Sequence, residues 1–304
     1  MGTKKVGICA LCQKKSKLRE SHIIPSLVFD WMKKTSATGY IRRSETPNLR
    51  VQNGYKIPLL CEDCENLFGV WEKHFAEEIF LPLYKNSESK VSYGPWLVKF
   101  AVSVSWRVAI FYKNMGWLSH FSQRLLNATD QCLLAWREFL LDLRLHPGRF
   151  EQHLLPLDAV KYTTDTDLPA NINRYLLRTV DMTIAHARVK EKAFVYTKMG
   201  PIVLIGFIEM PYPERWKGSR LDPSGGSVGG HTHYQVPASL FEFLKDRARN
   251  AATAYRSISQ RQKDKIAEDY DKKDLDAIAK SETFHALHED VLLFGEDAFE
   301  ETAK

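Results

Sequence analysis

The sequence predicts an α+β fold in two parts: a cysteine-bearing N-terminal domain of residues 1–90, and a larger, mostly helical domain of residues 91–304 that contains a small antiparallel sheet. Three observations predict this fold. Two Cys-x-x-Cys pairs lie within the first 64 residues, apolar residues recur at helical spacing over residues 95–145, and residues 193–209 alternate as strands do. A chain of 304 residues that is 44% hydrophobic and 26% charged is globular, which excludes a disordered or fibrous protein.

The expected elements of the larger part follow from the periodicity of its apolar residues. We expect helices within residues 95–145 and a further helix over residues 171–188. Residues 193–209 predict a β-hairpin, because two runs of β-forming residues flank a Met-Gly-Pro turn. Residues 212–232 are rich in Pro, Gly and Ser and indicate a loop, and residues 237–283 favour helix again.

Charge is unevenly distributed along the chain. The formal net charge is +6, but residues 1–60 contain twelve Lys and Arg against three Asp and Glu. Such a basic segment can contact phosphates without sequence preference. Residues 289–301 are acidic, and they form either a solvated tail or a segment that docks on the basic N-terminal part. The most apolar stretch is shorter than the roughly 20 residues of a membrane-spanning helix, so we expect a soluble, cytoplasmic protein.

The cysteines predict a structural zinc site. Cys9-Ala-Leu-Cys12 and Cys61-Glu-Asp-Cys64 are separated by 48 residues. Each pair places two thiolates on one side of a turn, and two such pairs complete a tetrahedral site with Zn–S distances of about 2.3 Å. A redox motif would need one pair rather than two. The fifth cysteine, Cys132, lies on an apolar helical face and is expected in the core. Because a domain of 60–90 residues has little core of its own, bound zinc would supply much of its folding energy.

The segment between the two pairs resembles a known family. It contains Ser21-His-Ile-Ile-Pro25, and Leu59-Leu-Cys61 then leads into a stretch that favours an amphipathic helix. This combination resembles the HNH endonucleases with a zinc-bound ββα-metal, treble-clef-like fold, over about residues 5–80. The resemblance implies a metal-dependent endonuclease that hydrolyses phosphodiester bonds, with DNA favoured over RNA. Similar modules often belong to bacterial antiviral defence or mobile-element systems.

The resemblance also implies roles for three residues. His22 stands at the position of the general base, which activates water to attack the phosphodiester. Glu65, directly after Cys64, stands at the position of the catalytic metal ligand, where an oxygen donor suits Mg²⁺ or Mn²⁺. Asn53 is the candidate for the Asn that braces the loop orienting the base.

The sequence departs from the family pattern at each neighbouring position. Ser21 precedes the base where many members have a ligating Asp, and Glu65 replaces the usual His or Asn. Asn53 lies eight residues before the second cysteine pair rather than about five. The second ligand of the catalytic metal is therefore not identified. Glu72 is a candidate, because seven residues separate it from Glu65 and place both on one helix face.

Two other functions stay open. In the first, the zinc site is structural and the basic face binds nucleic acid or a partner protein without cleaving. In the second, the larger domain senses a small molecule and switches the nuclease, and the Gly-rich segment of residues 224–233 is its support. No membrane partner is expected. The expected nucleic-acid face combines Trp31 and Tyr40 with seven basic residues: Lys14, Lys15, Lys17, Lys33, Lys34, Arg42 and Arg43.

Overall fold

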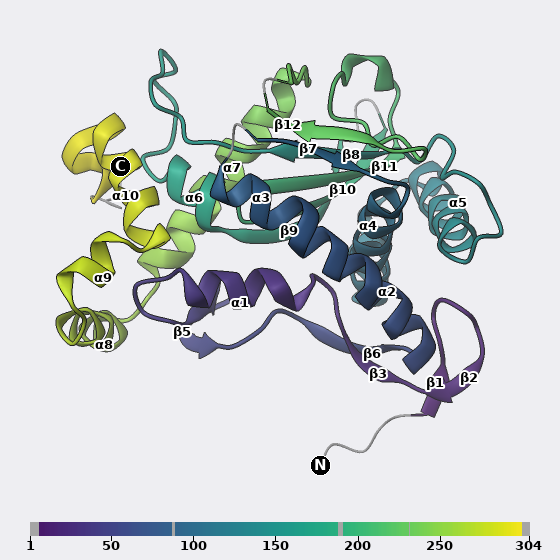
Figure 1. The fold of residues 1–304 in the computed structure, drawn as a ribbon, viewed down its shortest axis with the longest axis horizontal. Helices are drawn as coiled ribbons and strands as arrows, with labels where there is room; N and C mark the ends of the chain where they lie inside the picture. Colours follow the sequence, from purple (N-terminus) through teal and green to yellow (C-terminus); the bar gives the residue numbers. More distant parts are fainter. Residues whose placement is uncertain (1–5, 87–88, 188–190, 231, 300–304) are drawn as a thin grey trace.

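The computed structural model describes residues 6–86, 89–187, 191–230 and 232–299. Figure 1 shows an antiparallel sheet near the middle of the molecule, with helices on both of its faces and the N-terminal segment packed along one side. The α+β class that the sequence predicts is confirmed. Among the described residues, none of the helices is both long and apolar enough to cross a membrane.

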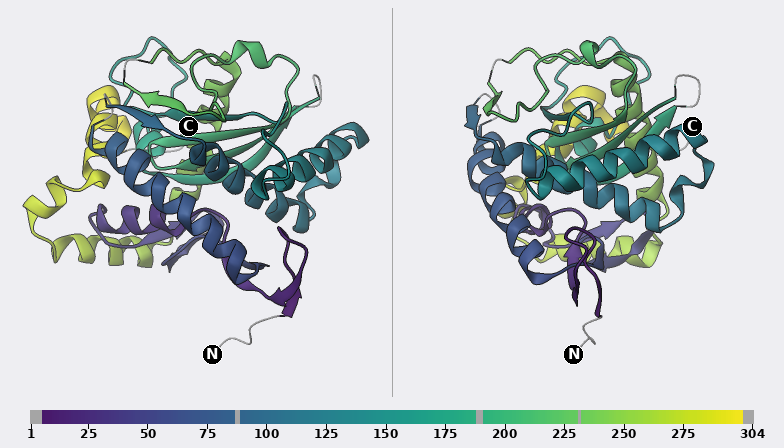
Figure 2. Two further views of the ribbon diagram at one scale, coloured as in Figure 1. Left: turned by 45° about the vertical axis from the view of Figure 1, so that its right-hand side comes forward. Right: turned by 90° about the vertical axis from the view of Figure 1, so that its right-hand side faces the viewer.

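The N-terminal segment consists of short strands and two helices. Its elements are β1 (Val6–Ile8), β2 (Lys15–Lys17), β3 (Arg19–His22), α1 (Ser26–Lys34), β4 (Ile41–Arg43), β5 (Thr46–Val51), β6 (Lys56–Leu60) and α2 (Glu62–His74). Strand β1 pairs with β2, β3 with β6, and β4 with β5, all antiparallel. Because β6 runs directly into α2, the β3–β6 pair and this helix form one ββα unit. Figure 2 shows the β1–β2 hairpin projecting from the body at the end where the N-terminus lies.

A long buried helix joins this segment to the rest of the molecule. After α2 the chain continues through a π-helical turn (Phe75–Phe80) and α3 (Leu81–Lys85) to strand β7 (Lys90–Tyr93) and helix α4 (Trp96–Asn114). Thirteen of the nineteen residues of α4 are buried. Helix α4 contacts α2, α5 (Gln123–Leu140) and all four strands of the sheet, so the two parts of the chain share one hydrophobic core.

The central sheet has four antiparallel strands in the order β8-β11-β10-β9. Their bounds are β8 (Gln152–Pro156), β9 (Val180–Ala187), β10 (Lys192–Met199) and β11 (Ile202–Glu209). Alternate residues of β11 face opposite layers: Ile202 and Leu204 join the core around α4, whereas Val203 and Ile205 join the core under α6 and α7. Because helices cover both faces of the sheet, its strands are almost continuous runs of apolar residues.

The remaining elements cover the second face of the sheet and one end of the molecule. They are α6 (Ile172–Arg178), β12 (Gly226–Gly229), α7 (Ala238–Arg256), α8 (Gln260–Asp271), α9 (Leu275–Ala279) and α10 (Glu282–Phe294), with 3-10 turns at Trp117–His120, Pro213–Arg215 and Gly295–Ala298. The acidic end is partly packed against α6, although Glu296 and Asp297 are exposed. Asp290 of α10 is fully buried, and its carboxylate accepts hydrogen bonds from the backbone of Asn173 and from Arg174.

The structure confirms the helices within 95–145, the hairpin at 193–209 and the helices within 237–283. The helix expected over 171–188 is wrong in its second half. It ends at Arg178, and β9 follows, because alternate residues of β9 such as Met182 and Ile184 are buried against α4 while the strand pairs with β10. The predicted loop also contains a strand, since β12 pairs with β7.

The glycines of residues 224–233 have a structural role in the pairing of β12 with β7. Gly225 and Gly229 have positive φ angles of 108° and 76°. A Cβ atom at Gly225 would lie 2.7 Å from the Tyr93 carbonyl oxygen, and one at Gly229 would lie 2.4 Å from that of Ser89. Only glycine permits this approach. The glycine content therefore needs no ligand to explain it; His231 of this segment lies outside the described residues.

Candidate metal centre and adjoining site

The four predicted cysteines lie together. Cys9 and Cys12 come from the turn between β1 and β2, and Cys61 and Cys64 from the start of α2. Their four Sγ atoms all lie within 4.8 Å of one another, and those of Cys12 and Cys61 are 3.8 Å apart. Tetrahedral zinc with Zn–S bonds of about 2.3 Å requires sulfur–sulfur edges of about 3.8 Å. The cluster therefore fits a structural metal such as zinc.

Backbone hydrogen bonds shape this cluster. The Cys9 amide donates to the Lys14 carbonyl, and the Gln13 amide donates to the Cys9 carbonyl, both at 2.9 Å. Gln13 closes the turn with a φ of 63°. The Ala10 amide donates to the Leu59 carbonyl at 3.0 Å, which joins the β1–β2 hairpin to β6. The two cysteine pairs are thus held close together by the fold itself.

The electrostatics of the cluster require a cation if all four thiols are to ionise. Burial raises the pKa of Cys9, but amide hydrogen bonds from Cys61, Cys12 and Leu11 outweigh it and lower the pKa to about 7. Burial and neighbouring sulfurs raise the pKa of Cys64 strongly. A bound divalent ion would compensate the charge of the remaining thiolates. Cys132 lies apart and fully buried, and its thiol donates to the Phe207 carbonyl at 3.6 Å, as expected for a core cysteine.

Beside the cluster, strand β3 faces the first two turns of α2. Alternate residues of β3 point toward the helix: Arg19 pairs with Glu62, and the Ser21 hydroxyl donates to the Glu65 carboxylate. Ser21 is fully buried, and its oxygen also accepts from the Leu60 amide at 3.3 Å. The Glu65 carboxylate therefore lies against the end of β3, beside the Ser21 hydroxyl.

His22 is the last residue of β3 and lies opposite Lys56 of β6. Its ring is half-buried, and Nε2 is buried without a hydrogen-bond partner among the described residues. Burial, aided by the positive charges of Lys56 and Arg107, lowers the pKa of His22 to about 4. The ring is therefore neutral at pH 7.

A buried arginine connects this site to the rest of the molecule. Arg107 of α4 has 2% of its side chain exposed, and its Nη1 atom lies 2.8 Å from a Glu72 carboxylate oxygen. The same nitrogen donates to the His22 carbonyl at 2.9 Å. Glu72 is thus engaged by Arg107, which disfavours the suggestion that it is a second metal ligand. The sequence offers one signal for Arg107, a charged residue within the apolar run of residues 97–112.

Asn53 lies in the loop between β5 and β6. Its backbone carbonyl accepts a 3.2 Å hydrogen bond from Arg43, whose guanidinium lies 4.3 Å from the centre of the Tyr55 ring. The Tyr55 carbonyl accepts from the Ile23 amide at 3.1 Å, so the loop adjoins the end of β3. Within the described residues, no hydrogen bond joins the Asn53 side chain to His22. The bracing role of Asn53 stays a prediction.

The predicted basic and aromatic face is only partly exposed. Trp31 is buried and packs edge-on against Phe80 and Tyr84, because α1 turns its apolar side toward the core. Tyr40 donates a hydrogen bond to Asp269 of α8. The basic residues that remain exposed at the zinc hairpin are Lys14, Lys15 and Lys17.

Comparison of the chain with protein-family models, with curated proteins and with solved structures found no match.

Proposed function

We propose that the chain is a metal-dependent HNH-type endonuclease that hydrolyses phosphodiester bonds of DNA, with the four cysteines holding structural zinc. The observation that carries the proposal is the arrangement at the end of β3. Glu65 of α2 lies against Ser21, and His22, the next residue of the strand, has a buried ring nitrogen with no partner among the described residues. Unsatisfied buried polar atoms are uncommon, and functional sites are one place where they occur.

His22 would act as the general base. A neutral imidazole accepts a proton from water while the water oxygen adds to phosphorus and the bond to the 3′-oxygen breaks. The Arg107 hydrogen bond to the His22 carbonyl fixes the backbone that carries the ring. The positive charges of Lys56 and Arg107, which help to lower the pKa of His22, also favour an approaching phosphate.

The described residues offer few ligands for the catalytic ion. Within them, the four cysteines are the only cluster of three or more metal-ligating side chains, so the described residues build no complete second site. Glu65, with the Ser21 hydroxyl beside it, would hold Mg²⁺ or Mn²⁺ together with substrate oxygens. Mg²⁺ is commonly bound by one or two carboxylates plus phosphates and water. When bound, the ion neutralises charge on the phosphate and the leaving oxygen.

Cleavage of supercoiled plasmid by zinc-loaded protein, with and without Mg²⁺ or Mn²⁺, tests the proposal. We expect divalent-dependent nicking by the wild type and a loss of about 10²–10⁴-fold in His22→Ala. Glu65→Gln should raise the Mn²⁺ concentration needed for half-maximal cleavage. His74→Ala is the matched control, because His74 lies on α2 and pairs with Glu78 away from β3.

Equal cleavage by the wild type and His22→Ala would contradict the proposal. Salt-sensitive DNA binding without cleavage would favour the binding module instead. Cleavage that appears only after a small molecule is added would favour the ligand-gated nuclease.

A further inference from the structure

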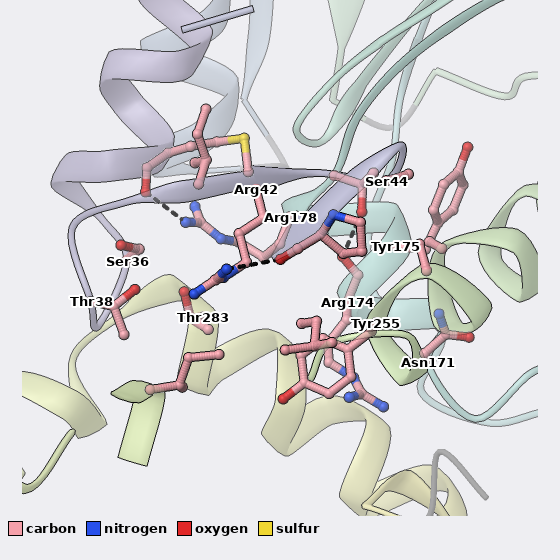
Figure 3. A pocket seen from close by; sticks show the side chains of 18 of the residues that line it. Ser36, Thr38, Arg42, Ser44, Asn171, Arg174, Tyr175, Arg178, Tyr255 and Thr283 are labelled. Atoms are coloured by element: carbon pink, nitrogen blue, oxygen red, sulfur yellow. Dashed lines mark hydrogen bonds between the residues drawn. The ribbon is translucent and has the colours of Figure 1, made fainter. Parts of the chain in front are cut away.

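A second site lies on the opposite side of the N-terminal segment from the cysteines. A cavity of about 410 Å³ opens between the β4–β5 hairpin and helices α6, α7, α8 and α10. Figure 3 shows Arg42, Arg174, Arg178 and Tyr255 extending into it from separate parts of the chain. The volume lies within the range of ordinary small-ligand pockets, about 300–1,000 Å³.

The cavity is strongly cationic. Four arginines line it, Arg42, Arg43, Arg174 and Arg178, and none of its described lining residues is an Asp or a Glu. Arg174 is neutralised by Asp290, whose carboxylate lies 2.8 Å from its Nε. The other three form no ion pair within the part of the chain that the structure describes. The negative charge of Glu282 acts on Arg178 from beyond ion-pair distance, so the wall carries an excess of positive charge that is only partly compensated.

The hydrogen bonds of these three arginines go to neutral acceptors, and those of Arg43 go to the Asn53 and Gly54 carbonyls in the loop between β5 and β6. Arg42 donates to the Pro47 carbonyl at 2.8 Å and to the Gln262 side chain at 3.0 Å. Arg178 donates to the Thr35 hydroxyl at 2.7 Å and to the Met32 carbonyl at 3.0 Å. The Nε atoms of Arg42 and Arg43 are buried without a partner among the described residues.

This arrangement is costly without an anion. Buried charges are normally paired, because removing a cation from water costs several kcal/mol in a protein. Burial disfavours the charged form of Arg178 and lowers the pKa of its guanidinium to about 10. Arginine guanidinium groups match phosphate oxygens with paired hydrogen bonds, so clustered arginines favour a phosphate-bearing ligand.

The other residues that line the cavity suit an aromatic base and a sugar. Tyr255 of α7 is 48% exposed and presents its ring at the cavity, which Tyr40 and Tyr270 also line. Ser36, Thr38 and Asn171 supply hydroxyl and amide groups. Aromatic rings that adjoin clustered arginines can stack on a base while the arginines hold its phosphates.

We propose that this cavity binds a nucleoside phosphate, with Arg42 and Arg178 at the phosphates and Tyr255 against the base. The site is separate from the cysteine cluster and from His22, and the proposal does not depend on nuclease activity.

Calorimetric titration of the full chain with ATP, GTP, CTP, UTP and inorganic pyrophosphate tests the site, with melting temperature as a second readout. We expect at least one nucleotide to bind the wild type with a Kd below about 100 μM and to raise its melting temperature. Arg42→Gln should weaken that binding by about tenfold or more, as the loss of a charge-assisted hydrogen bond does. Tyr255→Leu should weaken nucleotide binding but not pyrophosphate binding.

Controls separate a binding defect from a folding defect. Arg144→Gln removes an arginine from the turn after α5, where it faces Glu138 at 3.9 Å, and should bind as the wild type does. If Arg42→Gln proves unstable, Arg178→Lys is the alternative variant. It keeps the positive charge but loses the planar guanidinium, so it should still weaken binding. His22→Ala should bind normally, so failure of the nuclease proposal leaves this test intact.

Three results would overturn the proposal. One is that no nucleotide and no pyrophosphate binds the wild type. Another is that Arg42→Gln and Arg178→Lys both bind as tightly as the wild type. The third comes from including a 5′-phosphorylated DNA oligonucleotide: tighter binding of this strand than of every nucleotide would assign the cavity to a nucleic-acid end.

Discussion

The ββα unit and the four-stranded sheet are stabilised by different interactions. Strands β1, β2 and β3 have three or four residues each, whereas β9, β10 and β11 have eight. The sheet buries both faces under helices, so the hydrophobic effect suffices to hold it. The ββα unit also packs apolar side chains such as Phe68 into the core around α4, but it adds the four sulfurs, the Ser21–Glu65 contact and the Arg107–Glu72 pair. The region that carries the candidate site therefore combines apolar packing with a candidate metal cluster and polar contacts.

The largest expected effect comes from removing a cysteine ligand. Cys64→Ser should abolish stoichiometric zinc and unfold the N-terminal segment, because structural zinc contributes about 10–16 kcal/mol in zinc-finger peptides. Zinc content by mass spectrometry, limited proteolysis and calorimetry measure these effects.

Cys132→Ala is the matched control for this variant. It removes a buried thiol from the α5 core and should keep the zinc while costing about 1–2 kcal/mol. If the N-terminal segment resists protease equally well in Cys64→Ser and in Cys132→Ala, the cysteine cluster does not stabilise that segment.

The second largest loss of stability is expected at the ion pair that joins helix α2 to helix α4. Glu72→Gln leaves the Arg107 guanidinium buried without its carboxylate, which should cost about 3 kcal/mol, as for other broken buried pairs. Urea denaturation of the zinc-loaded protein measures the change in free energy of unfolding. The variant should also loosen the His22 backbone, since Arg107 donates to the His22 carbonyl. Glu77→Gln, an exposed change in the turn after α2, should cost less than about 0.5 kcal/mol.

The same contrast explains what the sequence predicts. Spacing alone located the four cysteines, because a metal site requires particular residue types at short separations. The β10–β11 hairpin was also predictable, since apolar runs and a Gly-Pro turn are local signals. Strand β9 was missed because pairing with β10 overrides the local pattern of residues 180–187.

The surroundings of the candidate site were less predictable. The burial of Trp31 depends on Phe80, Tyr84 and Gly200, which are distant in sequence. The basic residues near Trp31 in the sequence therefore wrongly suggest an exposed side chain. Arg107 lies 85 residues from His22, and no local pattern joins them. The cavity lined by Arg42 and Arg178 likewise combines segments that meet only in the folded chain.

A smaller effect is expected at Ser21. Ser21→Ala leaves the Leu60 amide without its acceptor and the Glu65 carboxylate without its donor, which should cost about 1–3 kcal/mol. Ser21→Asp tests the proposed function at the same position, because it restores the carboxylate of the family pattern. It should strengthen Mn²⁺ binding relative to the wild type at pH 7, as measured by calorimetry. Unchanged Mn²⁺ affinity in both Ser21→Asp and Glu65→Gln would exclude this position as the catalytic metal site.

The smallest expected effect is the pH dependence that His22 gives to the stability of the ββα unit. The folded-state pKa of about 4 lies below the ordinary value of about 6.5. The folded protein therefore binds this proton less readily than the unfolded chain does. The stability that His22 contributes is complete above about pH 6.5 and is lost as the pH falls from about 6.5 to 4. Urea denaturation at intervals over this range should show a steeper loss in the wild type than in His22→Gln.

The difference between these two pH profiles isolates one group, because other titrating residues contribute equally to both proteins. An NMR titration of the His22 ring should place its pKa near 4 in the zinc-loaded protein. A pKa near 6.5, together with parallel stability profiles of the wild type and His22→Gln, would mean that the ring is hydrated. His22 would then titrate as an exposed surface histidine does. A low pKa that rises when DNA is bound would instead indicate that a phosphate approaches the ring, because a negative charge stabilises the imidazolium.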